Sequence, residues 1–198
     1  MGSEMCIRDS YKSFRSRKLQ NIHLTSNSIV DATNQSDDII LDIGFGTGES
    51  TVSLNEIFSE HVVCGIEAYK PGVKKLIAEK IPVEYGDAAE IIEKFDDNKI
   101  SQIYMLFPDP WQKVKHRKRR LFSEYTFKII DRILKRGGFF HFASDNINYA
   151  LQAKRIIEIA SSRDVEFSKH RGFRPVTKYE VKGIEKRNFI FDLIYFKN

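Results

Sequence analysis

The sequence predicts a single α/β domain built on a mostly parallel β-sheet, and three observations lead to this expectation. From Ile39 onward, short apolar runs typical of buried strands alternate with helical patterns, which is the order of βαβ units. The chain has 198 residues, the size of one ordinary domain. Its composition, 41% hydrophobic and 30% charged, is typical of globular proteins rather than of disordered or collagen-like chains.

The chain begins with a segment of different character. Residues 1–38 show no sustained periodicity, so we expect a partly disordered N-terminal arm ahead of a folded domain at 39–198. Met1–Ser10 has no apolar core of a signal peptide, and we interpret this decapeptide as non-native sequence. No apolar run approaches the roughly 18 residues of a membrane span, so we expect a cytoplasmic protein without membrane contact. Two cysteines, Cys6 and Cys64, predict neither a disulfide framework nor a metal site.

Four strands are expected in the first half of the domain, because four short apolar runs are bounded by turn residues. They are Ile39–Ile43, Val62–Glu67, Ile81–Tyr85 and Ile100–Phe107. Helices are expected between them, from Gly48 to about Phe58, from about Pro71 to Lys80, and over Ala88–Phe95. Proline is favoured in the first helical turn, which supports the helix at Pro71.

The second half adds three strands, which brings the predicted sheet to seven. A helix over Ser123–Arg136 has one apolar face and a glycine stop at Gly137. A strand at Gly138–Ser144, a helix at Asn146–Ser161 and the closing strands Val165–Phe167 and Phe189–Phe196 follow. Ligands of such sheets bind beyond the carboxyl ends of the strands, so the turns after the first, second and fourth strands should share one edge.

The positive charge of the chain is concentrated in one segment. The net charge is +5, and Trp111–Arg120 holds six basic residues and no acidic one. Most such runs are solvated surface. This run lies in mid-chain, directly after a Pro-Asp-Pro-Trp turn, where a dense basic patch beside an aromatic ring suits phosphates next to an unstacked base. The run therefore indicates a nucleic-acid partner.

A glycine-rich turn follows the first predicted strand. Gly44, Gly46 and Gly48 allow backbone to pass close to a ligand. A third glycine in the dinucleotide spacing would fall at Glu49, whose carboxylate suits a pyrophosphate poorly, so the turn favours a ligand without phosphates such as S-adenosylmethionine (SAM). Glu67, at the end of the second strand, could hold ribose hydroxyls in a SAM enzyme or in a nicotinamide enzyme.

The segment after the fourth strand is the most distinctive. Two prolines fix the backbone around Asp109, and the following Trp111 could stack on a base or belong to the core. Other polar candidates have simpler interpretations beside functional ones. Asp87 could accept from an adenine amino group or cap a helix, Asp145 could cap the next helix, and Thr177 and Glu180 have capping-box spacing.

In this order, the motifs DIGFGTG, GIEAYKPGV, GDA, FPDPWQKVKHRKRRL, SDNINYA and RPVTKYEVKG resemble those of the bacterial tRNA (guanine-N7-)-methyltransferase family over roughly residues 39 to 196. That family consists of class I SAM-dependent methyltransferases that modify guanine-46 in the variable loop. The resemblance implies a Rossmann-like, mostly parallel seven-stranded sheet with helices on both faces and an antiparallel last strand. It also implies SAM as cofactor, tRNA as partner, no obligate protein partner, and a monomer or homodimer.

The resemblance also implies roles for individual residues. Asp109 would be the catalytic residue. SAM would be bound by Asp42, Gly44, Gly46, Gly48, Glu67, Asp87 and Asp109. The substrate would be contacted by Lys113, Asp145, Thr177, Lys178, Tyr179 and Glu180, and RNA by Lys115, His116, Arg117, Lys118, Arg119 and Arg120. The chain departs from the family where Asp42 stands in place of the usual Glu, and its N-terminal arm is hardly recognisable.

Three other functions remain open at this point. A nicotinamide-dependent oxidoreductase would share the fold but leave the basic run unexplained. An RNA-binding domain on a degenerate methyltransferase fold would bind tRNA without transferring a methyl group. Another SAM enzyme could act on a different base or on protein, and product analysis would identify it.

Overall fold

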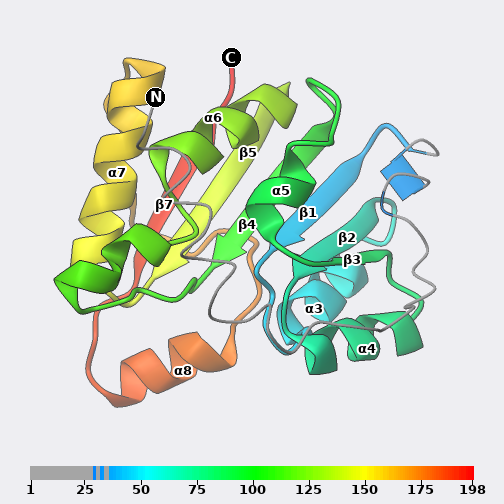
Figure 1. The fold of residues 1–198 in the computed structure, drawn as a ribbon, viewed down its shortest axis with the longest axis horizontal. Coiled ribbons are helices and arrows are strands. Elements are labelled where there is room, and N and C mark those ends of the chain that lie inside the picture. Colours follow the sequence, from blue (N-terminus) through cyan, green and yellow to red (C-terminus); the bar gives the residue numbers. More distant parts are fainter. Residues whose placement is uncertain (1–28, 30–31, 34–35) are drawn as a thin grey trace.

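A seven-stranded β-sheet with the strand order β3-β2-β1-β4-β5-β7-β6 forms the centre of the computed structural model, which describes residues 29, 32–33 and 36–198 (Figure 1). The strands are β1 Ile39–Ile43, β2 Val62–Glu67, β3 Val83–Tyr85, β4 Ile100–Leu106, β5 Leu134–Ser144, β6 Phe167–Ser168 and β7 Phe191–Phe196. The first five are parallel, and β7 runs antiparallel to β5 and β6. The predicted sheet and its antiparallel last strand are confirmed.

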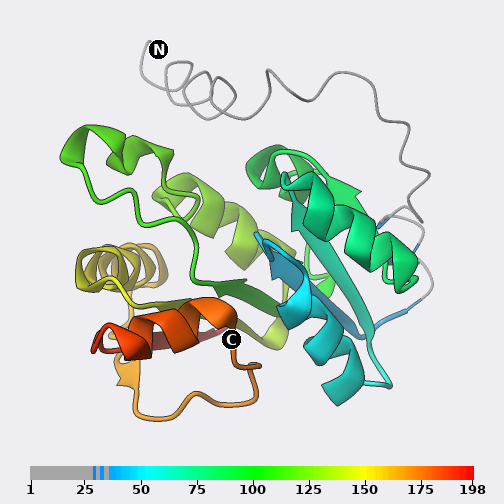
Figure 2. The same ribbon diagram turned by 90° about the horizontal axis from the view of Figure 1, so that it is seen from below.

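Helices cover both faces of this sheet (Figures 1 and 2). They are α3 Glu49–Ile57, α4 Lys70–Ala78, α5 Ala88–Ile92, the 3-10 helix η2 Val114–Arg119, α6 Glu124–Ile133, α7 Ile147–Ser161 and α8 Lys178–Glu185. The main core cluster joins α5, α6 and α7 to one face, where side chains of β1 such as Leu41 point. Ile40 points to the opposite face and packs with Leu54 of α3.

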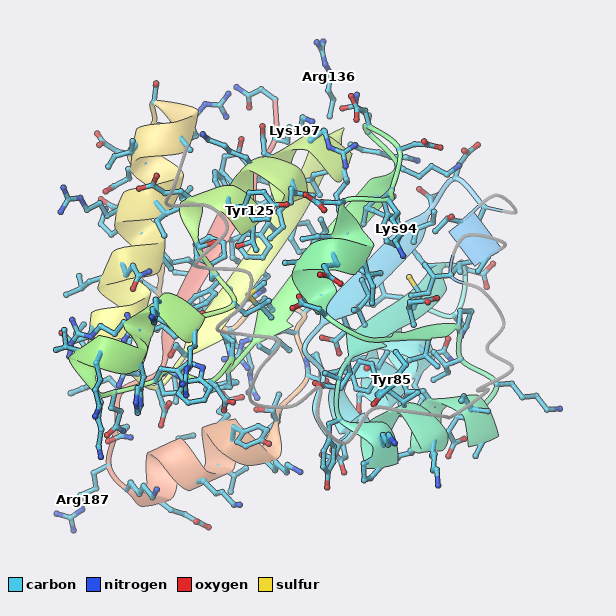
Figure 3. The ribbon with its side chains drawn as sticks, viewed as in Figure 1. Tyr85, Lys94, Tyr125, Arg136, Arg187 and Lys197 are labelled. Carbon is cyan, nitrogen blue, oxygen red and sulfur yellow. The ribbon has the colours of Figure 1, made fainter. Side chains whose placement is uncertain are left out.

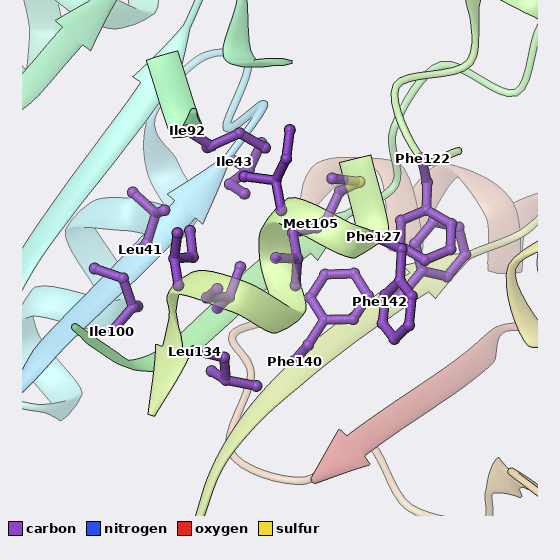
Figure 4. Close-up of a cluster of buried hydrophobic side chains, with 14 of the residues drawn as sticks. Leu41, Ile43, Ile92, Ile100, Met105, Phe122, Phe127, Leu134, Phe140 and Phe142 are labelled. Atoms are coloured by element: carbon purple, nitrogen blue, oxygen red, sulfur yellow. The ribbon is translucent and has the colours of Figure 1, made fainter. Parts of the chain in front are cut away.

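Aromatic side chains fill the core between α6, α7 and β5 (Figure 4). Phe122 stacks on Phe140 with ring centroids 5.3 Å apart, and its backbone N–H donates to the hydroxyl of Tyr149 at 2.8 Å. This bond satisfies the hydroxyl of a fully buried tyrosine, which would otherwise cost free energy. The segment before α6, which carries the basic run, is thereby fixed to the core.

The boundary between α6 and β5 corrects the sequence-based prediction. The helix ends at Ile133 and the strand begins at Leu134, where a helix to Arg136 with a stop at Gly137 was expected. Gly137 has a φ of +77°, but its N–H donates to the Lys197 carbonyl at 2.7 Å, so it belongs to an irregular strand. The helices η2 and α8 were not among the predicted elements, and β6 overlaps the predicted strand Val165–Phe167 only at Phe167. Other elements are shorter than predicted at one end, such as β3, which starts at Val83, and β7, which starts at Phe191.

Most of the predicted N-terminal arm lies outside the described residues, and so does Met1–Ser10. Ile29, within that region, is 1% exposed and belongs to the main core cluster. None of the helices in the described part of the chain is long and apolar enough to cross a membrane. At the surface, Arg187 after α8 lies at the opposite end of the molecule from Arg136 and Lys197 (Figure 3).

Candidate cofactor and substrate site

A cavity of about 290 Å³ opens at the carboxyl ends of β1, β2 and β4. This is the edge at which parallel α/β sheets bind ligands. The cavity is lined by Gly44, Gly46, Thr47, Glu67, Tyr69, Phe107, Pro108, Asp109, Trp111, Arg119, Leu121, Lys178 and Tyr179. The structure thus brings together the glycine turn, the end of β2, the proline-flanked turn and the start of α8, which are far apart in sequence.

The glycine turn has a backbone conformation that other residues adopt only with strain. Gly44, Gly46 and Gly48 have φ values of +75°, +65° and +90°. The Gly46 N–H donates to Glu67 Oε2 at 2.7 Å, so the turn is tied to the end of β2. Gly48 is the N-cap of α3. At Gly44 and Gly46, which line the cavity, the turn therefore presents backbone without a side chain.

Two further glycines, which the sequence analysis did not single out, support this turn from behind. A Cβ on Gly72 of α4 would lie 1.9 Å from the Gly46 carbonyl oxygen. A Cβ on Gly65 of β2 would lie 2.6 Å from the ring of Phe45. Both positions need glycine because the turn packs directly on the backbone of β2 and α4. The spacing of these glycines in the sequence shows no pattern that would have revealed this role.

Asp42 lies beneath the glycine turn and is fully buried. Its Oδ2 accepts hydrogen bonds from Ser50 at 2.8 Å and Thr51 at 2.9 Å, while Oδ1 is buried and has no hydrogen-bond partner among the described residues. Burial raises the pKa of Asp42 to about 6, although the two hydroxyls stabilise its anion. Asp42 is not among the lining residues, so the structure places it as a support of the α3 N-terminus and the turn.

Glu67 and Asp87 follow β2 and β3 and lie differently. Glu67 lines the cavity and is 7% exposed; besides Gly46, its carboxylate accepts from the N–H groups of Ala68 and Tyr69 at 2.7 and 2.8 Å. Asp87 caps α5 by accepting from the Ala89 N–H at 2.9 Å and does not line the cavity. The helix-capping interpretation of Asp87 is confirmed.

The proline-flanked turn projects Asp109 into the cavity. Phe107 and Trp111, on either side of it, have left-handed φ values of +53° and +42°. Such conformations in large residues cost free energy and are concentrated at functional sites. Asp109 is exposed, and Trp111 lines the cavity with the Arg119 guanidinium 5.1 Å from its ring centroid. The alternative that Trp111 belongs to the core is therefore wrong.

The basic run divides into residues that are exposed or half-buried and one buried residue, Arg120. Lys115–Arg119 form most of η2, and Lys113 is its exposed N-cap. Arg120 is only 6% exposed: its Nε donates to the Pro110 carbonyl at 2.8 Å, and its guanidinium lies over the ring of Tyr149. Its Nη1 also donates to Gln152 Oε1 of α7. These donors hold the proline-flanked turn and α7, and an RNA contact by Arg120 stays a prediction.

The start of α8 closes the cavity on another side. Lys178 and Tyr179 line it, and the Lys178 ammonium donates to the Thr47 hydroxyl of the glycine turn. Thr177 caps α8 by accepting from the Glu180 N–H at 3.1 Å, which is half of the expected capping box. The other half is absent, because the Glu180 carboxylate, in a residue 6% exposed, pairs instead with Arg174. Neither Thr177 nor Glu180 lines the cavity.

Asp145 also lies outside the lining, at the end of β5. It accepts from the side-chain amide of Asn188 at 3.0 Å. Asn146, rather than Asp145, caps α7 by accepting from the Tyr149 N–H at 3.0 Å. The proposed capping role of Asp145 is therefore wrong, and its carboxylate joins β5 to the segment after α8.

The residues present fit a nucleoside-like cofactor that carries no phosphate. The glycine turn offers bare backbone, and the carboxylates of Glu67 and Asp109 offer acceptors to hydroxyl and ammonium groups. The carboxylate of Glu67, which bonds the Gly46 N–H, disfavours a pyrophosphate beside the glycine turn. In the described residues, no group of three or more His, Cys, Asp or Glu side chains could hold a metal ion.

Comparisons with known proteins agree with this geometry. A family model described as "Putative methyltransferase" matches residues 36–193. The chain is 35% identical over 169 residues to the tRNA (guanine-N(7)-)-methyltransferase of Hydrogenovibrio crunogenus, covering 79% of this chain and 70% of that protein. It is 34% identical over 179 residues to the enzyme of the same name from Nitrosococcus oceani, covering 81% and 72%.

Similarity of fold extends to more distant proteins. The solved structure of an antibiotic-related methyltransferase superposes with a TM-score of 0.59 at 17% sequence identity, covering 89% of this chain and 96% of the other. At this identity the likeness concerns the fold alone.

Proposed function

The chain belongs to the tRNA (guanine-N(7)-)-methyltransferase family, and from this premise we propose that it transfers a methyl group from SAM to N7 of guanine-46 in the variable loop of tRNA. One observation carries the proposal: the glycine turn and the turn that carries Asp109 line one cavity together with Arg119 of the basic helix η2. A cytoplasmic location, where tRNA is modified, is part of the proposal.

The cofactor side of the cavity is formed by the glycine turn and two acidic residues. SAM, when bound, supplies a methyl group on a positively charged sulfur. We assign Gly44, Gly46 and Glu67 to its direct binding, with Glu67 accepting from ribose hydroxyls. Asp42 and Gly48 hold the turn, and Asp87 follows β3 at the same edge, where its carboxylate could accept from the adenine amino group.

The chemistry needs positioning more than proton transfer. Guanine N7 has a lone pair and no proton to lose, so no strong general base is required. The protein must align N7 with the methyl carbon at near-attack distance, which can supply much of the rate enhancement. We assign Asp109 to orient guanine through its N1–H and amino groups and to stabilise the positive charge that arrives on the base.

The substrate must reach this cavity from its stack in the tRNA. Lys178 and Tyr179 at the start of α8 and Trp111 on the opposite wall lie where an extruded base would enter. We assign Lys113 and Lys115–Arg119 to the RNA backbone, since η2 presents their cationic side chains beside the cavity. Asp145 and Thr177 hold the neighbouring segments that the substrate would contact.

Methyl transfer from labelled SAM to tRNA lacking N7-methylguanosine tests the function. Chemical cleavage at N7-methylguanine then identifies the modified position, and a single cut in the variable loop is the expected result. Label without that cut would refute the target position. Binding of a nicotinamide cofactor without binding of SAM would refute the methyltransferase.

Replacement of Asp109 by alanine tests its assigned role. We expect turnover to fall by a factor of roughly 10² or more, in the range known for loss of a positioned electrostatic group. Asp96→Ala is the matched control, because Asp96 is an exposed carboxylate that does not line the cavity. Near-normal turnover of Asp109→Ala with unchanged SAM affinity would show that Asp109 has no such role.

A further inference from the structure

A buried cluster of ionisable side chains lies beside the proposed active site without lining the cavity. It consists of Arg174, Asp192 of β7, Glu180 of α8 and His141 of β5, which are 3%, 6%, 6% and 1% exposed. Buried charges are costly unless they are paired and hydrogen-bonded. A cluster that gathers three charged side chains in the interior therefore calls for a specific role.

Arg174 is the centre of this cluster. Its Nε and Nη2 donate to the two oxygens of Asp192, the latter at 3.0 Å. Its Nη1 donates to Glu180 Oε2 at 2.7 Å and to the Pro175 carbonyl at 3.3 Å, and Nη2 also donates to Glu180 Oε1 at 3.4 Å. These five bonds match the five N–H groups of a guanidinium. His141 Nε2 lies 2.8 Å from Asp192 Oδ1 and fixes that carboxylate from the other side.

The guanidinium also contacts the turn that carries Asp109. Its carbon lies 5.5 Å from the ring centroid of Phe107, which has a left-handed backbone and lines the cavity. Phe107 is two residues before Asp109, and Glu180 directly follows Tyr179. Arg174 thus connects the two walls of the cavity, the turn after β4 and the first turn of α8, to the rigid strand β7.

We propose that Arg174 is a positioning residue for methyl transfer, which sets the start of α8 and the Asp109 turn at the distance that the reaction requires. The proposal rests on the proposed function. A misplacement of about 1 Å can lower a rate by about 10²-fold when the reaction depends on alignment. We therefore expect loss of this bridge to act mainly on kcat, because phosphate contacts made elsewhere maintain the KM for tRNA.

The chemistry explains why an arginine is needed. A planar guanidinium can bond two carboxylates at two different edges, whereas an ammonium is a single point charge. In Arg174→Lys the positive charge is retained, but one carboxylate loses its bidentate partner and the ring of Phe107 loses the flat cation above it. A role limited to charge neutralisation would tolerate this change.

The test compares Arg174→Lys with Arg132→Lys. Arg132 is the matched control, because it also bonds several acceptors, including the Phe95 carbonyl at 2.8 Å and the Glu93 carbonyl at 3.0 Å, but lies away from the cavity. Both variants are assayed far below their melting temperatures. We expect kcat to fall 10- to 100-fold in Arg174→Lys, with the KM for tRNA changed less than threefold, and both constants to stay within twofold in Arg132→Lys. Normal kcat in folded Arg174→Lys would overturn the proposal.

If Arg174→Lys does not fold, a second pair of variants tests the positioning role of Arg174. Asp192→Asn changes a residue whose bonds go to Arg174 and His141, so an effect on kcat must pass through the cluster. Tyr195→Phe is its control, since it removes the bond to Asp131 from the same strand. We expect kcat to fall about tenfold in Asp192→Asn alone, and equal kcat values in both variants would overturn the proposal.

A spectroscopic readout separates this proposal from the proposed function. Trp111 is the only tryptophan and lies on the same turn as Phe107. We expect acrylamide to quench Trp111 differently in Arg174→Lys than in the wild type, and identically in Arg132→Lys. If the wild-type protein methylates no tRNA guanine, the proposed function fails. A change in Trp111 quenching that is confined to Arg174→Lys would still support the connection of the two cavity walls by Arg174. Unchanged quenching of Trp111 in Arg174→Lys would overturn the positioning role of Arg174, even if the enzyme is active.

Discussion

Replacing the buried Asp42 with asparagine should make the stability of the protein less dependent on pH. Asp42 is fully buried, and in the described part of the chain only its Oδ2 accepts hydrogen bonds, from Ser50 and Thr51. Burial raises its pKa from the ordinary value of 3.8 to about 6. As the pH rises, the unfolded chain therefore releases the proton of Asp42 before the folded chain does.

The size of the effect follows from this difference. A raised pKa means that the folded state holds the proton more tightly, so the contribution of Asp42 to stability is greatest below about pH 4 and is lost as the pH rises through about 6. A difference of about two between the folded and unfolded pKa of Asp42 corresponds to about 3 kcal/mol of unfolding free energy. About 2 kcal/mol of this falls between about pH 4.5 and about pH 7.5.

Urea unfolding of the wild type and Asp42→Asn at several pH values measures this effect. The difference in unfolding free energy between the two proteins cancels the titration of all other groups, and we expect it to shift by about 2 kcal/mol in favour of Asp42→Asn over that interval. Thr51→Val serves as a second comparison. It removes a hydroxyl that stabilises the anion, so the stability of this variant should fall more steeply with pH. A difference between wild type and Asp42→Asn that stays constant with pH would refute the reasoning.

Three further outcomes are expected. Gly72→Ala should lose SAM binding in calorimetry and about 2 kcal/mol of stability, because the new Cβ would lie 1.9 Å from a carbonyl oxygen of the glycine turn. Gly137→Ala, whose Cβ would meet nothing within 4 Å, should keep SAM binding. Equal SAM affinities in the two variants would contradict the role of the glycine turn in SAM binding. Lys115→Ala should make the negative slope of log tRNA affinity against log salt shallower by roughly 0.7 to 0.9, and an unchanged slope would exclude a phosphate contact. Burial raises the pKa of the Cys64 thiol to about 12, so in a Cys6→Ser background thiol reagents should label Cys64 only on unfolding; rapid labelling of the folded protein would contradict this.

Local sequence patterns predicted those parts of the fold that local physics decides. The runs Ile39–Ile43 and Val62–Glu67 are strands at the predicted bounds, because short, mostly apolar runs are typical of parallel strands that are covered on both faces. The positions of the glycine turn and of Asp109 followed from the same alternation, since the carboxyl ends of parallel strands meet at one edge.

The end of α6 could not be predicted in this way. Gly137 has the left-handed conformation expected after a helix, and locally it is typical of a helix stop. Its N–H bonds to the Lys197 carbonyl, about sixty residues away in the chain, and this distant partner makes the segment from Leu134 part of a strand.

The sequence by itself determined the type of fold, the edge at which a ligand binds and the composition of the site, because spacing and apolar periodicity are properties of neighbouring residues. Only the tertiary structure decided which charges are exposed and which are buried. Arg119 and Arg120 are adjacent and chemically identical, yet one lines the cavity and the other holds the Pro110 carbonyl. Arg174 is likewise buried, and its guanidinium bonds both Glu180 of α8 and Asp192 of β7. The free energy of a charged side chain depends on the solvent and partners that surround it, and segments distant in sequence supply both.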